Sequence, residues 1–319
     1  MRRAVGWVAI VALLTAGIAW AATVPRGLGA DEAASLAAGD AARGANVFWA
    51  AGCESCHAAA KAQGDDRLLL GGGQQLATPF GTFSVPNISS DPADGIGSWS
   101  ETDFGNALLK GVSPDGRHYY PAFPYTSYAR MTAQDVADLY AFMKALPAVA
   151  GRAPGHQLGF PWSLRRGVGI WKLANLSDAP VVALDASDPL VARGQYLVEG
   201  PGHCGECHTA RGFGGAMDTS RWLAGGPAPE GTGRIPNITP GGAVADWSAA
   251  DLAYYFETGF TPDFDTAGGS MASVQRNLAE LPPGDRAAIA AYLKAVPAVP
   301  SETTPDAPAE STPAAPASP

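Results

Sequence analysis

Apolar side chains recur with a helical period in two segments, near residues 140 and 290. Positions i, i+3, i+4 and i+7 share one helix face, and this spacing holds for Val136, Leu139, Tyr140 and Met143 and again for Ile289, Tyr292, Leu293 and Val296. We therefore predict two amphipathic helices, each with an aromatic residue on its buried face. No stretch shows strand-like alternation of comparable length, so the predicted fold class is mainly α.

A second pair of helices is expected upstream of these, where a glycine stands beside bulky side chains. Gly44 is followed by Phe48, and Gly194 is followed by Tyr196 and Val198. A small residue lets two helices approach closely. We expect each upstream helix to cross the corresponding last helix, with the glycine admitting Tyr140 or Tyr292.

The chain opens with Arg2 and Arg3, followed by an uncharged apolar run over residues 4–25. At about 1.5 Å per residue, this run is long enough to cross a hydrocarbon layer of about 30 Å. Residues 1–30 are therefore a signal peptide or a membrane anchor. The triplet Ala19-Trp20-Ala21 favours cleavage, whereas the length of the run favours an anchor, which we prefer. Both readings send the rest of the chain across a bacterial inner membrane, to its periplasmic face if the segment is retained and to the soluble periplasm if it is cleaved.

Much of the remaining sequence is written twice. GTFSVPNI at residues 81–88 corresponds to GTGRIPNI at 231–238, and Trp99-Ser100 with Asp103 corresponds to Trp247-Ser248 with Asp251. Both serines suit helix N-caps. A repeat of about 150 residues is too long for a solenoid unit. We predict two homologous domains at 31–150 and 188–299, joined by a linker at 151–187 whose Pro and Gly residues interrupt any periodicity.

Each predicted domain contains one C-x-x-C-H string: Cys53-Glu54-Ser55-Cys56-His57 and Cys204-Gly205-Glu206-Cys207-His208. Together they use all four cysteines. In this motif two thiols bond to one porphyrin, and the adjacent imidazole ligates the iron. A zinc site would need two such pairs converging or further histidines, and a dithiol redox pair needs no following histidine. We predict two covalently attached haem c groups, bound by Cys53, Cys56, His57, Cys204, Cys207 and His208, with His57 and His208 on iron.

Longer stretches resemble a known family. The attachment strings and their flanking helices resemble the class I cytochrome c fold, twice over. PFGTFSVPNISSDP, GIGSWSETDF and YYPAFPYTSYARM in the first half, and GQYLVEGPGHCGECHTARGFGG and GGSMASVQRNLAEL in the second, resemble the cytochrome c subunits of membrane-bound alcohol and sugar dehydrogenases. The resemblance covers about residues 39–299 and implies two tandem class I cytochrome c-like domains behind an N-terminal hydrophobic helix. Family members typically have a third haem domain; here an acidic, Pro-rich stretch at 300–319 follows, which we expect to be disordered.

The sixth iron ligand decides between a closed electron-transfer site and an open reactive one. For the second haem we predict Met271, which lies in a loop before the last helix, and the resemblance points to the same residue. For the first haem, the position corresponding to Met271 is Phe123, which cannot ligate iron; relatives often have Met there. We predict Met131 instead, with His118 or an open site as alternatives. A buried core position is the competing interpretation of Met131, which corresponds to Leu281.

The predicted function is electron transfer. The protein would accept electrons from a periplasmic or membrane-bound quinoprotein or flavoprotein dehydrogenase and pass them to a downstream cytochrome, oxidase or quinone site. No acid, base or nucleophile constellation appears, so we assign no catalytic residue and interpret the chain as a dehydrogenase subunit rather than an enzyme. The net charge of −9 argues against nucleic acid as a partner. The alternative is a dihaem peroxidase with a five-coordinate first haem, for which Phe123 is the sole support; a haem-based gas sensor has the same support.

Overall fold

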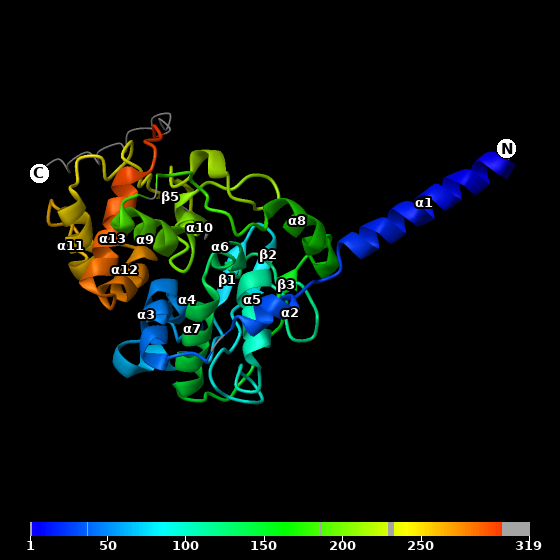
Figure 1. The fold of residues 1–319 in the computed structure, drawn as a ribbon, viewed down its shortest axis with the longest axis horizontal. Helices are drawn as coiled ribbons and strands as arrows, with labels where there is room; N and C mark the ends of the chain where they lie inside the picture. Colours follow the sequence, from blue (N-terminus) through cyan, green and yellow to red (C-terminus); the bar gives the residue numbers. More distant parts are fainter. Residues whose placement is uncertain (1, 37, 186, 229–232, 302–319) are drawn as a thin grey trace, which may run out of the picture.

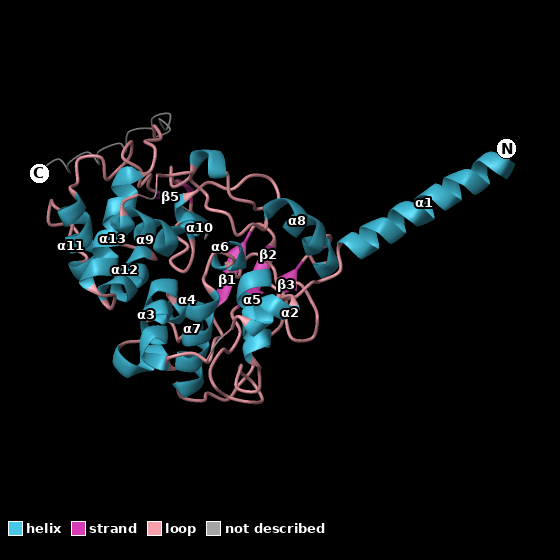
Figure 2. Ribbon diagram, viewed as in Figure 1, coloured by secondary structure: helices cyan, strands magenta, loops and turns pink. Residues whose placement is uncertain are grey.

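The structure is a computed structural model that describes residues 2–36, 38–185, 187–228 and 233–301. Helices are its main regular elements (Figure 2), which confirms the mainly-α prediction for the described residues. The helices are α1 (Arg2–Ala22), α2 (Ala30–Ala34), α3 (Ala41–Ala51), α4 (Cys53–His57), α5 (Glu101–Lys110), α6 (Tyr125–Tyr128), α7 (Ala133–Ala145), α8 (Val168–Asn175), α9 (Pro189–Glu199), α10 (Gly205–His208), α11 (Ala249–Thr258), α12 (Met271–Ala279) and α13 (Pro283–Ala295). Of the predicted tail, only residues 300 and 301 lie inside the described ranges.

The predicted crossings of first and last helices are present in both halves of the chain. The first half is the predicted domain at residues 31–150, and the second half is the predicted domain at residues 188–299. α3 packs on α7, and α9 packs on α13. A Cβ at Gly194 would lie 1.9 Å from the carbonyl oxygen of Ala288 and 2.7 Å from Cβ of Tyr292, so only glycine permits this approach. The expectation for Tyr292 is therefore confirmed.

The corresponding expectation for Tyr140 is wrong. A Cβ at Gly44 would meet the carbonyl oxygen of Asp138 at 1.9 Å and Cβ of Phe142 at 2.9 Å. Tyr140 instead packs on Phe104 of α5, with the ring centroids 4.9 Å apart. The physical reason is that α7 packs against both α3 and α5. The periodicity of its apolar residues does not say which of these two helices Tyr140 contacts.

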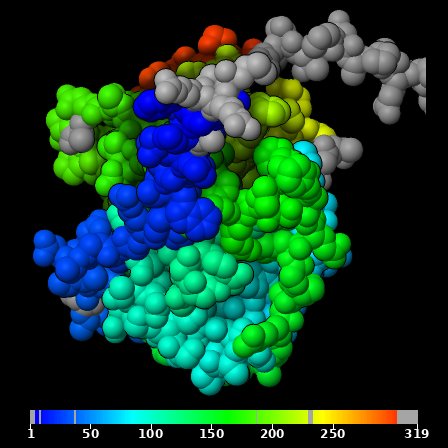
Figure 3. Space-filling model, turned by 90° about the vertical axis from the view of Figure 1, so that its right-hand side faces the viewer, coloured from blue at the N-terminus to red at the C-terminus, as the bar shows by residue number. Residues whose placement is uncertain are grey.

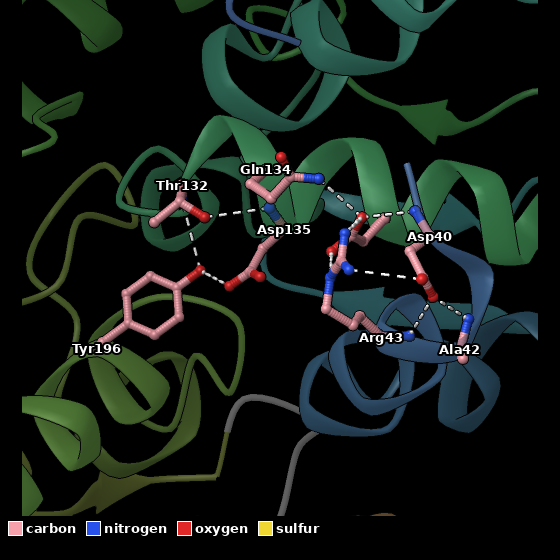
Figure 4. A network of polar contacts seen from close by, with 8 residues as sticks. Asp40, Ala42, Arg43, Thr132, Gln134, Asp135 and Tyr196 are labelled. Carbon is pink, nitrogen blue, oxygen red and sulfur yellow. Dashed lines mark hydrogen bonds and ion pairs between the residues drawn. The ribbon is translucent and has the colours of Figure 1, made fainter. Parts of the chain in front are cut away.

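An ion pair between Asp138 of α7 and Arg43 of α3, whose side chain is 58% exposed, fastens the first crossing. Figure 4 shows Arg43 in this network, together with Asp40 and Gln134. Asp138 is fully buried on α7 and accepts hydrogen bonds from Arg43 Nε at 2.7 Å and from the backbone N–H of Asp40 at 2.6 Å. Burial raises the pKa of this carboxyl group, but the hydrogen bonds from Arg43, Asp40 and Gln134 outweigh it and hold the pKa below its usual value. Asp138 is therefore ionised where the two helices meet.

Serine caps begin the middle helix of each half, as predicted. The hydroxyl oxygen of Ser100 accepts a hydrogen bond from the N–H of Asp103, and the Asp103 carboxylate accepts one from the N–H of Ser100. Together these two bonds form a capping box. Ser248 and Asp251 make the same box at the start of α11. Both helices end at a glycine in the left-handed conformation, Gly111 or Gly259.

Short strands, which were not predicted from the sequence, are also present. The strands β1 (Gln75–Thr78), β2 (Gly81–Ser84) and β3 (Gln157–Leu158) form one antiparallel sheet, and β4 (Gly226–Pro227) pairs with β5 (Arg234–Ile235). These strands have four residues or fewer, which is too short to produce a clear alternating pattern. Because β3 lies in the predicted linker, this segment packs on the first half.

The buried apolar residues form two separate cores, one in each half. The first is built on α3, α5 and α7, and the second on α9, α11, α12 and α13. Figure 1 shows the two halves side by side, with α12 next to α3 and α4. Ala50 of α3 belongs to the second core, so the halves share an apolar contact.

The N-terminal helix α1 projects away from the rest of the protein (Figure 1). Among the described helices, it is the one long and apolar enough to cross a membrane, over Val5–Ala22. Its C-terminal end is held by the first half and by the turn that precedes α8. The carbonyl oxygen of Thr23 accepts a hydrogen bond from His118 Nε2 at 2.9 Å, and Arg166 contacts both Thr23 and Trp20.

Candidate functional site

Each C-x-x-C-H string forms a single helical turn. In the first half, Gly52 adopts a left-handed conformation with φ 58°, which separates α3 from α4. In the second half, α10 follows α9 after a longer turn at Gly200–Cys204, in which His203 has a positive φ of 38°.

In both strings, the Nδ1 atom of the histidine forms a hydrogen bond with a proline carbonyl oxygen. His57 Nδ1 lies 2.8 Å from the carbonyl oxygen of Pro86, and His208 Nδ1 lies 2.9 Å from that of Pro236. Because a carbonyl can only accept, Nδ1 must carry the proton. The lone pair is then on Nε2, so Nε2 is the nitrogen that can bind a metal ion.

Two glycines position these histidines, and sequence reasoning missed their role. The N–H of Gly72 donates to the carbonyl oxygen of His57 at 2.8 Å, and the N–H of Gly225 donates to that of His208 at 2.7 Å. Both glycines have positive φ, 71° and 77°. A Cβ at Gly72 would lie 2.4 Å from the carbonyl oxygen of Pro86. The available signal was a run of adjacent glycines upstream of each P-N-I string, at residues 71–73 and at 225–226.

The asparagine of each P-N-I string ties the proline carbonyl to the end of its half. Asn87 Nδ2 donates to the carbonyl oxygen of Val149 at 2.6 Å, and Asn237 Nδ2 donates to that of Val299 at 2.7 Å. Both acceptors follow the last helix of their half. The repeated sequence thus encodes a repeated support for the histidine.

Burial sets the protonation of these groups. It lowers the pKa of His57 to about 4 and also lowers the pKa of His208, so both rings are neutral at pH 7. It raises the pKa of the Cys53 and Cys204 thiols to about 12. A thiol with a raised pKa is a poor dithiol nucleophile, so these positions do not have the electrostatics of a redox pair.

This donor set fits haem c. None of the four cysteines forms a disulfide, and a neutral imidazole with a lone pair on Nε2 adjoins each pair of thiols. No group of three or more His, Cys, Asp or Glu side chains is placed to hold a metal ion anywhere in the described ranges. We therefore expect each of these histidines to bind the iron of a haem, whose porphyrin would supply four further nitrogen ligands.

The two candidate methionines lie in the cores that contain the attachment cysteines. Met131 is 6% exposed and belongs to the first core, against which Cys53 and Phe123 pack. Met271 is the first residue of α12 and packs against the second core, as Cys204 does.

Met131 and Leu281 occupy equivalent positions in the two halves. The N–H of Met131 donates to the carbonyl oxygen of Tyr128 at 2.9 Å, and the N–H of Leu281 donates to that of Leu278 at 3.1 Å. Each residue directly precedes the N-cap of the last helix, Thr132 or Pro282. The equivalence predicted from the repeat is therefore present.

The remaining histidines lie elsewhere. His118 is buried and bonded to Thr23, and burial lowers its pKa more than this hydrogen bond raises it. His203 Nε2 donates to the carbonyl oxygen of Ala51 at 3.1 Å, which joins the second half to the first. His156 is exposed in the linker, where its Nδ1 accepts the N–H of Ser84 at 3.2 Å.

Each attachment string contacts the opposite half of the chain. Ser55, which lies between the first two cysteines, accepts a hydrogen bond from Asn277 of α12 at 2.8 Å. Glu206, which lies between the second two cysteines, accepts bonds from Thr126 and Ser127 of α6 at 2.9 and 3.1 Å. Both strings therefore lie at the interface between the two halves, each against the segment that precedes the other half's last helix.

Another polar contact lies farther along this interface (Figure 4). Tyr196 of α9 donates to the carboxylate of Asp135, and the N–H of Thr132 donates to the Tyr196 hydroxyl oxygen at 3.3 Å. Thr132 and Asp135 are both at the start of α7. The interface is thus polar at this edge and apolar around Ala50.

Comparisons with known proteins agree with this geometry. Residues 41–147 match the cytochrome c family. The chain is 57% identical over 261 residues to a diheme cytochrome c-type protein of Cereibacter sphaeroides, which covers 82% of this chain and 87% of the relative. It is 39% identical over 260 residues to the fructose dehydrogenase cytochrome subunit of Gluconobacter japonicus and 37% identical over 268 residues to the cytochrome c subunit of the alcohol dehydrogenase (quinone) of Gluconobacter oxydans. The matches cover 80% and 81% of this chain but 52% and 55% of those two subunits, so the chain spans about half their length.

Proposed function

Because the chain belongs to the family of dihaem c-type cytochromes, we propose that it relays electrons from a periplasmic or membrane-bound dehydrogenase to the respiratory chain. Family membership establishes a cytochrome c that carries two covalently bound haem c groups and transfers electrons. The donor, a quinoprotein or flavoprotein dehydrogenase, and the acceptor, a cytochrome, oxidase or quinone site, are our proposal. Two relatives, named as cytochrome subunits of fructose and alcohol dehydrogenases, support the choice of donor.

The observation that carries the proposal is that each attachment string contacts the opposite half of the chain. Ser55 meets Asn277, and Glu206 meets Thr126. Two carriers built into one interface need no diffusion between them. Each bound haem supplies a one-electron carrier, and the chain's own residues fix the separation and orientation of the pair. We propose two tandem class I cytochrome c-like domains, residues 31–150 and 188–299, as the architecture.

The residue assignments follow from the donor chemistry. We propose thioether bonds at Cys53, Cys56, Cys204 and Cys207, with His57 and His208 as iron ligands through Nε2. As sixth ligands we propose Met271 and Met131, since a thioether sulfur suits this iron. The burial of Met131 in the core that also contacts Cys53 supports the second assignment. The named relatives give no support to the peroxidase alternative.

We further propose that α1 remains attached and anchors the protein in the bacterial inner membrane, with the rest on the periplasmic face. The docking of its C-terminal end supports this. Thr23 is 5% exposed and contacts both His118 and Arg166. Cleavage after the triplet at 19–21 would remove Trp20, whose carbonyl oxygen accepts a hydrogen bond from Arg166 Nη2 at 2.7 Å.

Co-purification tests the proposed donor. Affinity-tagged full-length chain isolated from native membranes should bring down a dehydrogenase, and addition of that enzyme's substrate should reduce both haems, as read from their visible absorption bands. The control is the same preparation from a strain that lacks the dehydrogenase gene, in which substrate should reduce neither haem. Equal reduction in both preparations, or rapid peroxide turnover by the isolated chain, would contradict the relay.

A further inference from the structure

The short helix α8 (Val168–Asn175) has its apolar face turned outward. Val168, Gly169 and Lys172 are buried, whereas Ile170 is 62% and Leu173 is 68% exposed. Ile170 and Leu173 are three residues apart and share one helix face. Leu164 and Phe160, just upstream, are 58% and 82% exposed. Neighbouring large apolar side chains that face water mark an interaction surface.

This segment is attached directly to the end of α1. The guanidinium of Arg166 lies 4.2 Å from the centre of the Trp20 ring, and its Nη2 donates to the carbonyl oxygen of Trp20 at 2.7 Å. A Cβ at Gly169 would lie 2.8 Å from Cβ of Thr23. Figure 3 looks onto the end of the molecule from which α1 projects, and the blue helix adjoins green segments there. The exposed face of α8 therefore starts at the level where α1 ends.

That level corresponds to the edge of a bilayer if α1 spans it. The apolar span runs over Val5–Ala22, so Trp20 and Thr23 lie where the hydrocarbon gives way to headgroups, the usual depth of tryptophan in membrane proteins. The headgroup layer is only about 5–8 Å thick on each side, from a total of about 40–45 Å and a core of about 30 Å. A side chain that projects from α8 beside Thr23 is within this layer.

Charge favours the same occupant. Between Asp138 and Asp178 the chain has no carboxylate, whereas the whole protein has a net charge of −9. Arg165 and Arg166 lie in this stretch. A segment without acidic side chains that bears arginines contributes no repulsion of anionic lipid headgroups.

We propose that α8 is an interfacial helix that lies on the bilayer surface beside α1 and inserts Ile170 and Leu173 among the phospholipid headgroups. This rests on the proposal that α1 remains attached and spans the membrane. A single helix leaves the protein free to pivot. A second contact at α8 restricts that rotation and holds both halves at a defined orientation to the membrane.

Fluorescence from single engineered cysteines tests this in the full-length holoprotein. The native cysteines are consumed by haem attachment, so a thiol-reactive nitrobenzoxadiazole reports only the new site. The probe is placed at Leu173→Cys or Ile170→Cys, at Leu13→Cys within α1, and at Tyr254→Cys, which is 56% exposed on α11 at the end of the molecule opposite α1 (Figure 1). Each variant is reconstituted into phosphatidylcholine–phosphatidylglycerol vesicles after its haem content is verified by absorption.

We expect the probes on α8 and α1 to shift their emission to shorter wavelength and to be quenched by nitroxide-bearing phospholipids, and the probe at Tyr254→Cys to show neither change. A lipid-quenched probe at Leu13→Cys with unquenched, water-like probes on α8 would overturn the interfacial helix while leaving the anchor intact, and would assign the α8 face to a protein partner. Unquenched probes at all positions would overturn both proposals.

Discussion

Arg67 is the side chain that joins the two halves most directly, and replacing it should loosen their interface. It is 9% exposed and donates to Glu280 at 2.8 Å and to Asn277 at 3.0 Å, both in the second half. Its guanidinium lies 4.3 Å from the centre of the Trp49 ring. Its Nε is 3.4 Å from the carboxylate of Glu54, the residue after Cys53.

The expected cost of Arg67→Met follows from what would be left behind. The bond to Glu280 contributes little, at most about 1 kcal/mol, because that carboxylate is 44% exposed. The hydrogen bond to Asn277 involves a charged donor and contributes about 1.5–3 kcal/mol. Glu54 is 4% exposed, and breaking a buried pair by removing one partner costs about 3–5 kcal/mol. These effects overlap, so we expect the folded protein to lose about 3–5 kcal/mol of unfolding free energy.

Guanidinium chloride unfolding of the holoprotein, followed through the haem absorption bands, measures this loss. The Arg67→Met/Glu54→Gln double variant should regain part of the stability, because the buried carboxylate is then neutral. Glu280→Gln is the matched control and should cost at most about 1 kcal/mol. An Arg67→Met variant no less stable than Glu280→Gln would refute the reasoning, as would a double variant that loses further stability.

Two further predictions concern the iron ligands and the helix crossing. Met131→Leu and Met271→Leu should each remove one of two thioether-to-iron charge-transfer bands from the oxidised spectrum. The control is Met143→Leu, which alters a methionine that is 2% exposed on α7 and should keep both bands. If Met131→Leu also keeps both bands, Met131 is a core residue like Leu281 and not a ligand. Asp138→Asn should be less stable than wild type at neutral pH, because the folded-state pKa of Asp138 lies below its usual value of 3.8. The stability contributed by this carboxylate is present above that value and is lost as pH falls through the lower folded pKa, so the difference in unfolding free energy should shrink with acid. Exposed Asp65→Asn is the control, and a pH-independent difference for Asp138→Asn would contradict the assignment.

The covalent chemistry of this protein is local and was readable from the sequence alone. A C-x-x-C-H string places two thiols and an imidazole on one turn of chain, so Cys53, Cys56 and His57 predicted haem c without any tertiary information. The helices were readable for the same reason, since i, i+3 and i+4 spacing and a serine followed by Asp103 are short-range patterns. Counting along the repeat then showed that Met131 and Leu281 are equivalent positions.

Tertiary structure decided how these parts are held and joined. That Pro86 orients His57, that Tyr140 turns toward Phe104 rather than Gly44, and that Arg67 reaches Asn277 all depend on contacts between residues far apart in the chain. Such contacts have no local periodicity, because they follow from the shapes of packed helices. The outward apolar face of α8 belongs to the same class. The sequence alone determined that the residues near 170 are apolar. Only the packing of Gly169 against Thr23 and of Lys172 against the carbonyl oxygens of Lys110 and Gly111 decided that Ile170 and Leu173 face outward.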